Sequence, residues 1–60
     1  MKQVMKVEMY GQIYAVYQKP GVQYEFKVYR PLAGRQKIYL DEFESFQEAM
    51  EYVVRKLYAD

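Results

Sequence analysis

The 60-residue sequence contains no cysteine, histidine, tryptophan, threonine or asparagine. The absence of cysteine excludes a disulfide, a zinc–thiolate site and a thiol nucleophile. The absence of histidine removes the commonest metal ligand and the commonest general base. The single serine, Ser45, has no partner for a catalytic dyad or triad. We therefore expect no enzymatic activity, no metal and no cofactor.

Long apolar runs are also missing. No stretch approaches the roughly 20 apolar residues of a membrane-spanning helix, so we expect no membrane partner. Residues 1–9 alternate polar and apolar side chains and lack the continuous apolar core of a signal peptide, which favours a cytoplasmic protein. The three glycines are spaced as turn or bend residues and not as a phosphate-binding loop, and we expect no small-molecule substrate.

The composition that remains is typical of one small globular domain covering residues 1–60. Apolar residues make up 52% of the chain, eight residues are tyrosine, and nine basic residues against eight acidic ones give a formal charge of +1. A chain of this size buries only about 60% of its unfolded surface. Small domains usually add disulfides, a metal or a partner chain. Because the first two are lacking here, we expect a homodimer or a complex with a larger protein.

The first part of the chain has the period-2 pattern of a half-buried strand. The odd-numbered residues of this segment form an apolar set on one face, namely Met5, Val7, Met9, Gly11, Ile13, Ala15 and Tyr17. The segment is either one long strand bent at Gly11 or a hairpin with a three-residue loop over 9–11, which we favour. A two-residue loop would move the apolar set of the second strand to the other face and is disfavoured.

Two further turns follow. Lys19-Pro20-Gly21-Val22 is typical of a tight turn, because proline presets φ and glycine accepts a positive φ. This turn predicts a strand over 22–30 with its even-numbered residues inside. Leu32-Ala33-Gly34 fits a three-residue hairpin loop, which predicts a next strand over about 35–41 with Ile38 and Leu40 inside.

A helix is predicted from Ser45 to about Ala59. Ser45 and Glu48 have the spacing of a capping box. The apolar stripe behind it comprises Phe46, Ala49, Met50, Val53, Val54, Leu57 and Tyr58. We therefore predict an α+β fold, with an antiparallel meander of three or four strands followed by one C-terminal helix packed on one sheet face. The strand residues of the predicted core are Val7, Ile13, Ala15, Tyr24, Phe26, Val28, Ile38, Leu40 and Phe43.

The sheet face that the helix leaves bare is the candidate binding surface. Cations that meet phosphates and rings that stack or pack are typical of a nucleic-acid surface. The candidate nucleic-acid-binding residues, all expected on this face, are Lys6, Tyr10, Tyr14, Lys27, Tyr29, Arg35, Lys37 and Tyr39. The same face also suits a protein interface, because tyrosine offers a large contact area with a polar tip. That interface would serve a homodimer or a small phage- or host-encoded inhibitor that docks on a larger protein, and a plain solvated face is the third interpretation.

Residues 24–57 carry a resemblance to a known family. The strand Tyr24-Glu25-Phe26-Lys27-Val28-Tyr29, the turn Gly34-Arg35-Gln36-Lys37 and the helix opening Phe43-Glu44-Ser45 with Glu48-Ala49 are similar to the arm-type DNA-binding domains of tyrosine recombinases. Those domains have an AP2-like fold of three strands and a helix. The resemblance implies that the bare sheet face docks in the major groove of duplex DNA. It implies DNA contacts by Lys27, Tyr29, Arg35, Lys37 and Tyr39, whereas Lys6, Tyr10 and Tyr14 are added from strand parity alone.

Overall fold

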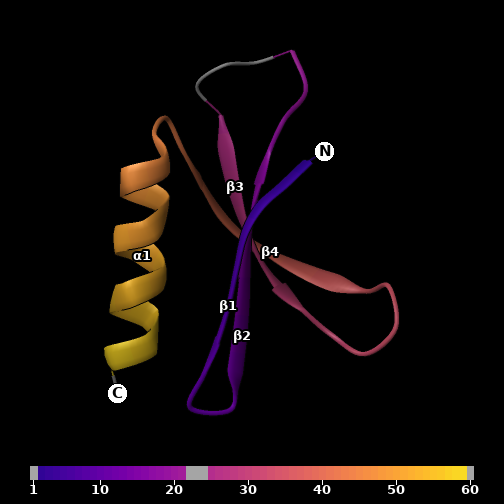
Figure 1. The fold of residues 1–60 in the computed structure, drawn as a ribbon, viewed down its shortest axis with the longest axis vertical. Coiled ribbons are helices and arrows are strands. Elements are labelled where there is room, and N and C mark those ends of the chain that lie inside the picture. Colours follow the sequence, from indigo (N-terminus) through magenta and orange to yellow (C-terminus); the bar gives the residue numbers. More distant parts are fainter. Residues whose placement is uncertain (1, 22–24, 60) are drawn as a thin grey trace.

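The computed structural model describes residues 2–21 and 25–59. Four strands and one helix follow one another along the chain: β1 Lys2–Met9, β2 Gln12–Gln18, β3 Phe26–Pro31, β4 Lys37–Phe43 and α1 Phe46–Tyr58. The strands form one antiparallel sheet in the order β1-β2-β3-β4, so each strand pairs with its neighbour in the sequence (Figure 1). The predicted α+β meander is confirmed, and the sheet has four strands rather than three.

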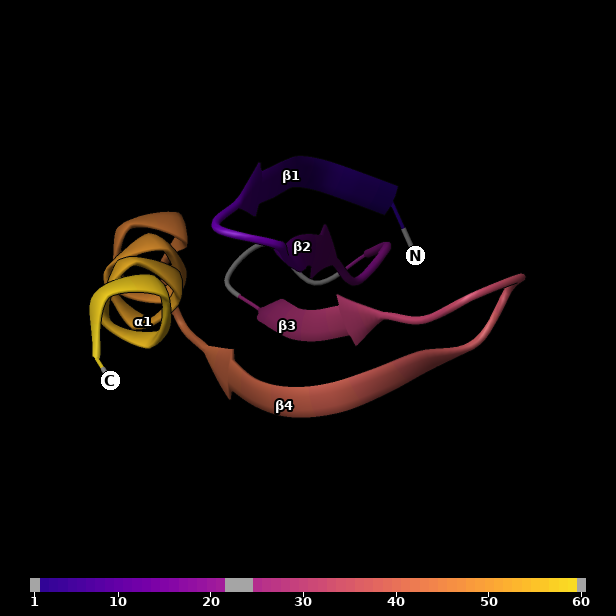
Figure 2. The same cartoon turned by 90° about the horizontal axis from the view of Figure 1, so that it is seen from below.

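The helix covers one face of the sheet and leaves the other face open (Figure 2). Its main neighbours are β3, β4 and β2, so that β1 lies at the margin of the helix-covered area. The sheet is strongly twisted, as expected from the right-handed twist of individual strands. The β3–β4 hairpin extends away from α1, and its tip is the part of the chain farthest from the helix in this view.

The first hairpin differs from the predicted one. Met9 pairs with Gln12, so the loop consists of the two residues Tyr10 and Gly11. Both have a positive φ, 55° at Tyr10 and 73° at Gly11. Positive φ at both central residues is the signature of a type I′ turn, whose twist matches that of the flanking strands. The predicted three-residue loop is therefore wrong, because this match outweighs the cost of a left-handed tyrosine.

The two-residue turn reverses the faces predicted for β2. Val7 pairs with Tyr14, so the even-numbered residues of β2 share the inward face of β1. Ile13 and Ala15 consequently lie on the side of the sheet opposite α1, and their predicted place under the helix is wrong. Ala15 is nevertheless fully buried, by side chains of that other face.

The β2–β3 connection is longer than the predicted tight turn, because residues 19–25 separate Gln18 from its pairing partner Phe26. Gly21 has a φ of 76°, which the turn needs and glycine tolerates. The strand ladder resumes with Gln18 opposite Phe26, the first residue of β3. Phe26 faces α1 as predicted. The predicted strand start at Val22 and the predicted core residue Tyr24 lie outside the described residues.

The β3–β4 loop is five residues long rather than three. Pro31 pairs with Lys37, and the Leu32 N–H donates to the carbonyl oxygen of Gln36 at 2.9 Å. Both loop lengths are odd, so the predicted parity holds for residues 37–39, and a β-bulge between Tyr39 and Asp41 reverses it from Asp41 onward. Because β4 begins and ends two residues later than predicted, Ile38 lies beyond the reach of α1 and is 47% exposed, which corrects its predicted place in the core.

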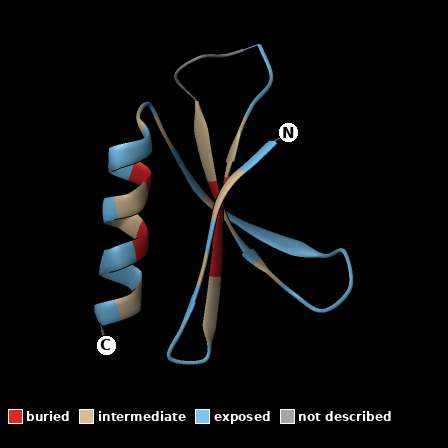
Figure 3. Cartoon of the chain, viewed as in Figure 1, coloured by how far each residue is buried: buried red, intermediate tan, exposed pale blue. Residues whose placement is uncertain are grey.

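The hydrophobic core is small and lies between α1 and the centre of the sheet (Figure 3). Its buried residues are Tyr14, Val16, Val28, Ala49 and Val53. Partly buried side chains pack around them: Val4, Met5, Val7, Phe26, Leu40, Phe43, Tyr52 and Leu57. The core therefore includes the predicted residues Val7, Phe26, Val28, Leu40 and Phe43 of the strands.

The helix begins and ends where the sequence predicts. Ser45 is the N-cap residue, and its Oγ accepts a hydrogen bond from the Glu48 N–H at 3.1 Å. The Ser45 hydroxyl in turn donates to a carboxylate oxygen of Glu48 at 3.3 Å. The C-cap is Ala59. Only Ala49 and Val53 of the predicted apolar stripe are buried, so the remaining stripe residues lie partly or largely at the surface.

Candidate functional site

The side of the sheet opposite α1, which we call the bare face, collects one side chain in two from each strand. The strand register assigns to it Gln3, Lys6, Glu8, Ile13, Ala15, Tyr17, Lys27, Tyr29, Pro31, Lys37, Tyr39 and Glu42. One row of this set crosses all four strands, from Lys6 through Ala15 and Tyr29 to Tyr39. The small Ala15 lies between larger neighbours, which explains its burial on a face that no helix covers.

Three tyrosine rings on the bare face form what we call the tyrosine cluster: Tyr17, Tyr29 and Tyr39. The ring centroids of Tyr17 and Tyr29 are 5.3 Å apart with the planes at 90°, and those of Tyr29 and Tyr39 are 5.7 Å apart at 65°. Each such edge-to-face pair stabilises by about 0.5–1.5 kcal/mol beyond area burial. The ammonium nitrogen of Lys37 lies 4.1 Å from the Tyr17 centroid and 4.8 Å from the Tyr29 centroid. The ring quadrupoles therefore hold a positive charge in place over the cluster.

The phenol groups at the margin of the cluster have partners of their own. The Tyr17 hydroxyl donates to Oε1 of Gln3 at 3.2 Å, and the Tyr39 hydroxyl donates to Oε1 of Glu42 at 3.2 Å. Partial desolvation, followed by the negative charge of Glu42, raises the pKa of the Tyr39 phenol above its usual 10.0. Tyr39 is therefore a neutral hydrogen-bond donor at physiological pH.

Beyond the tyrosine cluster the β3–β4 hairpin continues without the rest of the sheet. The last pair between β2 and β3 is Ala15 with Tyr29, whereas β3 and β4 stay paired as far as Pro31 with Lys37. A β-bulge in β4 lies next to this point, opposite the step from Val28 to Tyr29 of β3. Bulges bend a strand and increase its twist. Residues 30–38, which we call the basic ribbon, are thus a two-stranded arm that projects from the four-stranded sheet.

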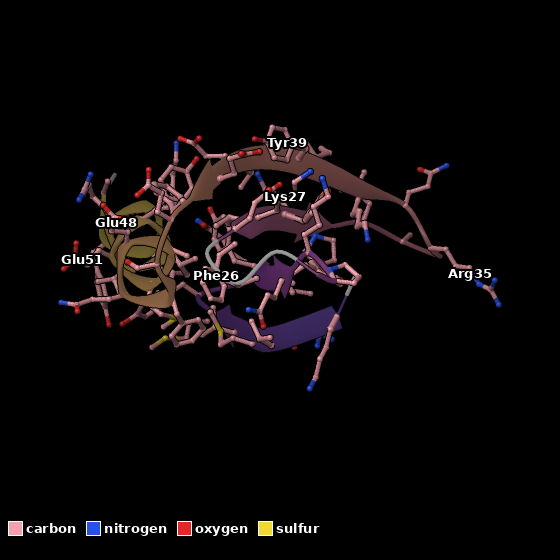
Figure 4. The ribbon with its side chains drawn as sticks, turned by 90° about the horizontal axis from the view of Figure 1, so that it is seen from above. Phe26, Lys27, Arg35, Tyr39, Glu48 and Glu51 are labelled. Atoms are coloured by element: carbon pink, nitrogen blue, oxygen red, sulfur yellow. The ribbon has the colours of Figure 1, made fainter. Side chains whose placement is uncertain are left out.

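Charge is separated along the molecule. Residues 26–40 contain four basic residues and no acidic one, and residues 41–54 contain five acidic residues and no basic one. The four basic residues are Lys27, Arg30, Arg35 and Lys37. Figure 4 shows Arg35 at one end of the molecule and Glu48 and Glu51 at the other. A net charge near zero therefore conceals a basic tip on the β3–β4 hairpin, whereas α1 carries both acidic residues, Glu48 and Glu51, and basic ones, Arg55 and Lys56.

Most of the predicted site residues lie together. The bare face holds five of the eight, namely Lys6, Lys27, Tyr29, Lys37 and Tyr39. Lys27 also forms an ion pair with Glu25, with 3.6 Å between Nζ and Oε1. Arg35 lies apart from them in the loop of the basic ribbon, where it is exposed. The bare face and the ribbon are continuous, because both belong to the β3–β4 hairpin.

The other two predicted residues, Tyr10 and Tyr14, do not lie on the bare face. Tyr14 is a core residue that is 5% exposed, and its hydroxyl donates to Oε1 of Gln12 at 2.9 Å. Tyr10 lies in the first turn, where its ring meets that of Tyr58 with 5.8 Å between centroids. A hydrogen bond with Tyr58 is the main cause of a raised pKa of Tyr10. Both corrections follow from the two-residue turn, which sends odd-numbered residues of β2 to the bare face.

Two residues of the surface are missed by sequence reasoning. The wrong loop length assigns Tyr17 to the helix side, and a Tyr10-Gly11 type I′ turn is the signal that places it correctly. Arg30 has the even numbering of the inward-facing residues of β3, so sequence parity does not place it on the surface. It is exposed nevertheless, because α1 does not extend over the ribbon. The uninterrupted basic character of residues 26–40 is the signal that could have found it.

The bare face and ribbon offer cations, phenol rings and hydroxyl donors, which is the chemistry of a binding surface. Among residues 2–21 and 25–59, no group of three or more carboxylates is placed to hold a metal ion. Within the same residues no helix has the length and apolarity to cross a membrane.

Comparisons with protein-family models, with curated proteins and with solved structures find no match to this chain. The resemblance of residues 24–57 to arm-type DNA-binding domains therefore stays a similarity of sequence motifs.

Proposed function

We propose that this chain is a non-enzymatic module that binds duplex DNA through the basic ribbon and the adjoining bare face. One observation carries this proposal. A two-stranded arm, residues 30–38, projects away from α1 and has three basic residues and no acidic one. The resemblance to arm-type domains, in which a sheet face docks on DNA, points in the same direction.

The shape of the ribbon suits the major groove. The groove of B-DNA is about 12 Å wide and admits a helix or a two-stranded β-ribbon. A four-stranded sheet is too broad to enter in the same way, but residues 30–38 are free of β1 and β2. The ribbon would therefore enter the groove while the rest of the bare face approaches the groove edge.

Cations on the ribbon point to both of its faces. Arg30, which pairs with Ile38, and Lys37, which pairs with Pro31, occupy adjacent rungs of the ladder. Side chains on adjacent rungs point to opposite faces of a strand pair. A ribbon inside the groove thus presents a cation toward each phosphate backbone, and Arg35 at the tip supplies a planar donor for phosphates or for the edge of guanine.

The tyrosine cluster gives the ribbon a rigid base. Lys37 is held over two rings and Tyr39, which is 50% exposed, is the outermost ring. A cation that is already ordered loses less side-chain entropy when it meets a phosphate. The acidic residues of 41–54 repel phosphate and orient the molecule, so that its basic end approaches the duplex first.

Fluorescence anisotropy of a labelled duplex and of a single strand of the same length tests the proposal. If Arg30, Arg35 and Lys37 each neutralise one phosphate, affinity falls about 40-fold between 50 and 200 mM salt. We expect the duplex to bind at least about tenfold more tightly than the single strand, since the groove is a duplex feature. Equal affinity for the duplex and for the single strand, or binding that does not respond to salt, would overturn the proposal. The second of these results points to the protein-interface alternative.

Paired variants separate a local effect from a general effect of charge. Arg30→Gln with Arg35→Gln removes two ribbon cations that lie outside the tyrosine cluster. We expect the salt dependence, the slope of log K on log salt, to become shallower by about 2. Arg55→Gln with Lys56→Gln is the matched control, because it removes two exposed cations from the last turn of α1. Equal losses in both double variants would show that only net charge matters and would contradict docking through the ribbon.

A further inference from the structure

A second surface, on the opposite edge of the sheet from the basic ribbon, combines an open strand with exposed apolar side chains. β1 is one edge of the sheet, and within the described residues it pairs with β2 alone (Figure 2). An open edge presents a row of backbone donors and acceptors that can pair with another strand. From this edge we propose that the chain forms a two-fold homodimer in which β1 pairs antiparallel with β1 of a second copy.

The pattern of side chains along β1 selects one register. Lys6 and Glu8 point to the bare face, whereas Met5, Val7 and Met9 point to the side of α1. Opposite residues of an antiparallel pair must share a face, so a two-fold axis can pass through Val7. That register sets Lys6 opposite Glu8 of the second copy, and symmetry repeats this ion pair.

The same register matches apolar residues on the other face. Val7 lies opposite Val7 of the second copy, and Met5 lies opposite Met9 of the second copy. Charges and apolar side chains are thus both satisfied by one arrangement over residues 5–9. A β-bulge between Gln3 and Met5 ends the regular edge on the N-terminal side, so the pairing is limited to this segment.

Apolar side chains of α1 lie next to this edge. Met50, Val54 and Tyr58 recur at intervals of four residues and therefore line one flank of the helix. Figure 4 shows methionine sulfur atoms gathered between α1 and β1. Val54 is 46% exposed and Tyr58 is 63% exposed. The Tyr58 ring contacts the ring of Tyr10 in the first turn.

The exposed area next to β1 suits a small dimer. Tyr10 and Tyr58, at 67% and 63% exposure, offer roughly 250 Å² of side-chain surface per copy. Met9, Val54 and the backbone of the edge add further surface. The total area that two copies could bury together therefore approaches the minimum of about 1,000 Å² for a specific interface. The core of the chain contains few fully buried side chains, and a partner copy is the usual supplement for a domain of this size.

The other edge of the sheet is less suited to self-association. β4 carries Asp41 and Glu42 side by side, with Glu44 immediately after the strand. An antiparallel pair of β4 strands centred on residues 41–42 would bring these carboxylates together, and like charges across a strand pair are destabilising.

Sedimentation equilibrium of the wild-type chain, without nucleic acid and from about 5 to 500 μM, tests this proposal by charge exchange. We expect the mass to rise from the 7.3 kDa of one chain toward twice that value. Either Lys6→Glu or Glu8→Lys places like charges opposite each other twice, which should weaken dimerisation roughly tenfold or more. The double variant Lys6→Glu with Glu8→Lys restores opposite charges and should restore the dimer.

Lys56→Glu, an exposed change on the flank of α1 that faces β4 through Tyr52, is the matched control for charge and should leave dimerisation unchanged. Circular dichroism checks that the single variants keep the fold, which we expect because both side chains are exposed. A wild-type chain that stays monomeric at 500 μM overturns the proposal. Single variants that dimerise as the wild type does, or a double variant that does not recover, overturn it as well and move the contact to another surface. Because no nucleic acid is present, the result is independent of the proposed DNA binding.

Discussion

The type I′ turn of the first hairpin can be tested by replacing the tyrosine that it holds in a left-handed conformation. Tyr10 has a φ of 55°, a conformation that costs an ordinary L-residue about 1–2 kcal/mol. Asparagine tolerates this region better, and Asn-Gly is the preferred pair for such turns. Tyr10→Asn therefore removes about 1 kcal/mol of backbone strain.

The same substitution also removes a ring contact. The edge-to-face pair of Tyr10 with Tyr58 is worth about 0.5–1.5 kcal/mol. In the wild-type background the two effects oppose each other, and we expect the free energy of unfolding to change by less than about 0.5 kcal/mol. In a Tyr58→Ala background only the backbone gain remains, so Tyr10→Asn should stabilise by about 1 kcal/mol.

Urea unfolding followed by circular dichroism at one low protein concentration measures all four members of this cycle. With a slope of about 1 kcal/mol per molar urea for so small a domain, the expected gain moves the midpoint by about 1 M. Gly11→Ala is the control for the second turn residue. No atom lies within 4 Å of the added Cβ, so its expected loss of about 1 kcal/mol comes from the φ of 73°. Destabilisation by Tyr10→Asn in both backgrounds would refute the left-handed turn and favour a longer loop.

Two further predictions concern the core and the tyrosine cluster. Val28→Ala should lower the free energy of unfolding by about 2 kcal/mol, because it leaves a cavity in the core. Val54→Ala, at a half-exposed helix position, is the control and should change the free energy of unfolding by less than about 0.5 kcal/mol in the same urea titration. Similar losses in the two variants would contradict the assigned core. Glu42→Gln should lower the pKa of Tyr39 while desolvation keeps it above 10.0, which NMR titration of ring-labelled tyrosine can follow with Tyr39→Phe for assignment. Because the folded chain holds the Tyr39 proton more tightly than the unfolded chain, this contribution to stability is complete below pH 10.0 and is lost as the pH rises through the raised pKa; an unchanged titration would show that Glu42 has no influence.

Local sequence signals determined the elements whose ends depend on neighbouring residues. Ser45 and Glu48 satisfy the first turn of α1 whatever packs against it, so the helix start could be read directly. Gly21 has the positive φ that its turn chemistry requires. The inward residues of β3 follow from strict alternation, which placed Lys27 and Tyr29 on the bare face.

Only the tertiary structure decided which face of β2 lies under the helix. Both faces of that strand are apolar, with Tyr14 and Val16 on one and Ile13 and Ala15 on the other. The choice depends on one residue of loop length, and the twist of the flanking strands favours the two-residue turn. Tyr17 consequently joins the tyrosine cluster rather than the core.

The reach of the helix was likewise a tertiary property. Parity alone cannot show that α1 stops short of the β3–β4 tip, where Arg30 and Ile38 are exposed on the helix side. Nor can a net charge of +1 show that Arg35 lies at one end of the molecule and Glu48 and Glu51 at the other. The sequence by itself determined which segments form strands, turns and helix, because those choices depend on contacts within a few residues. The faces, the clusters and the charged ends depend on how distant segments meet, and the packing of the whole chain decided them.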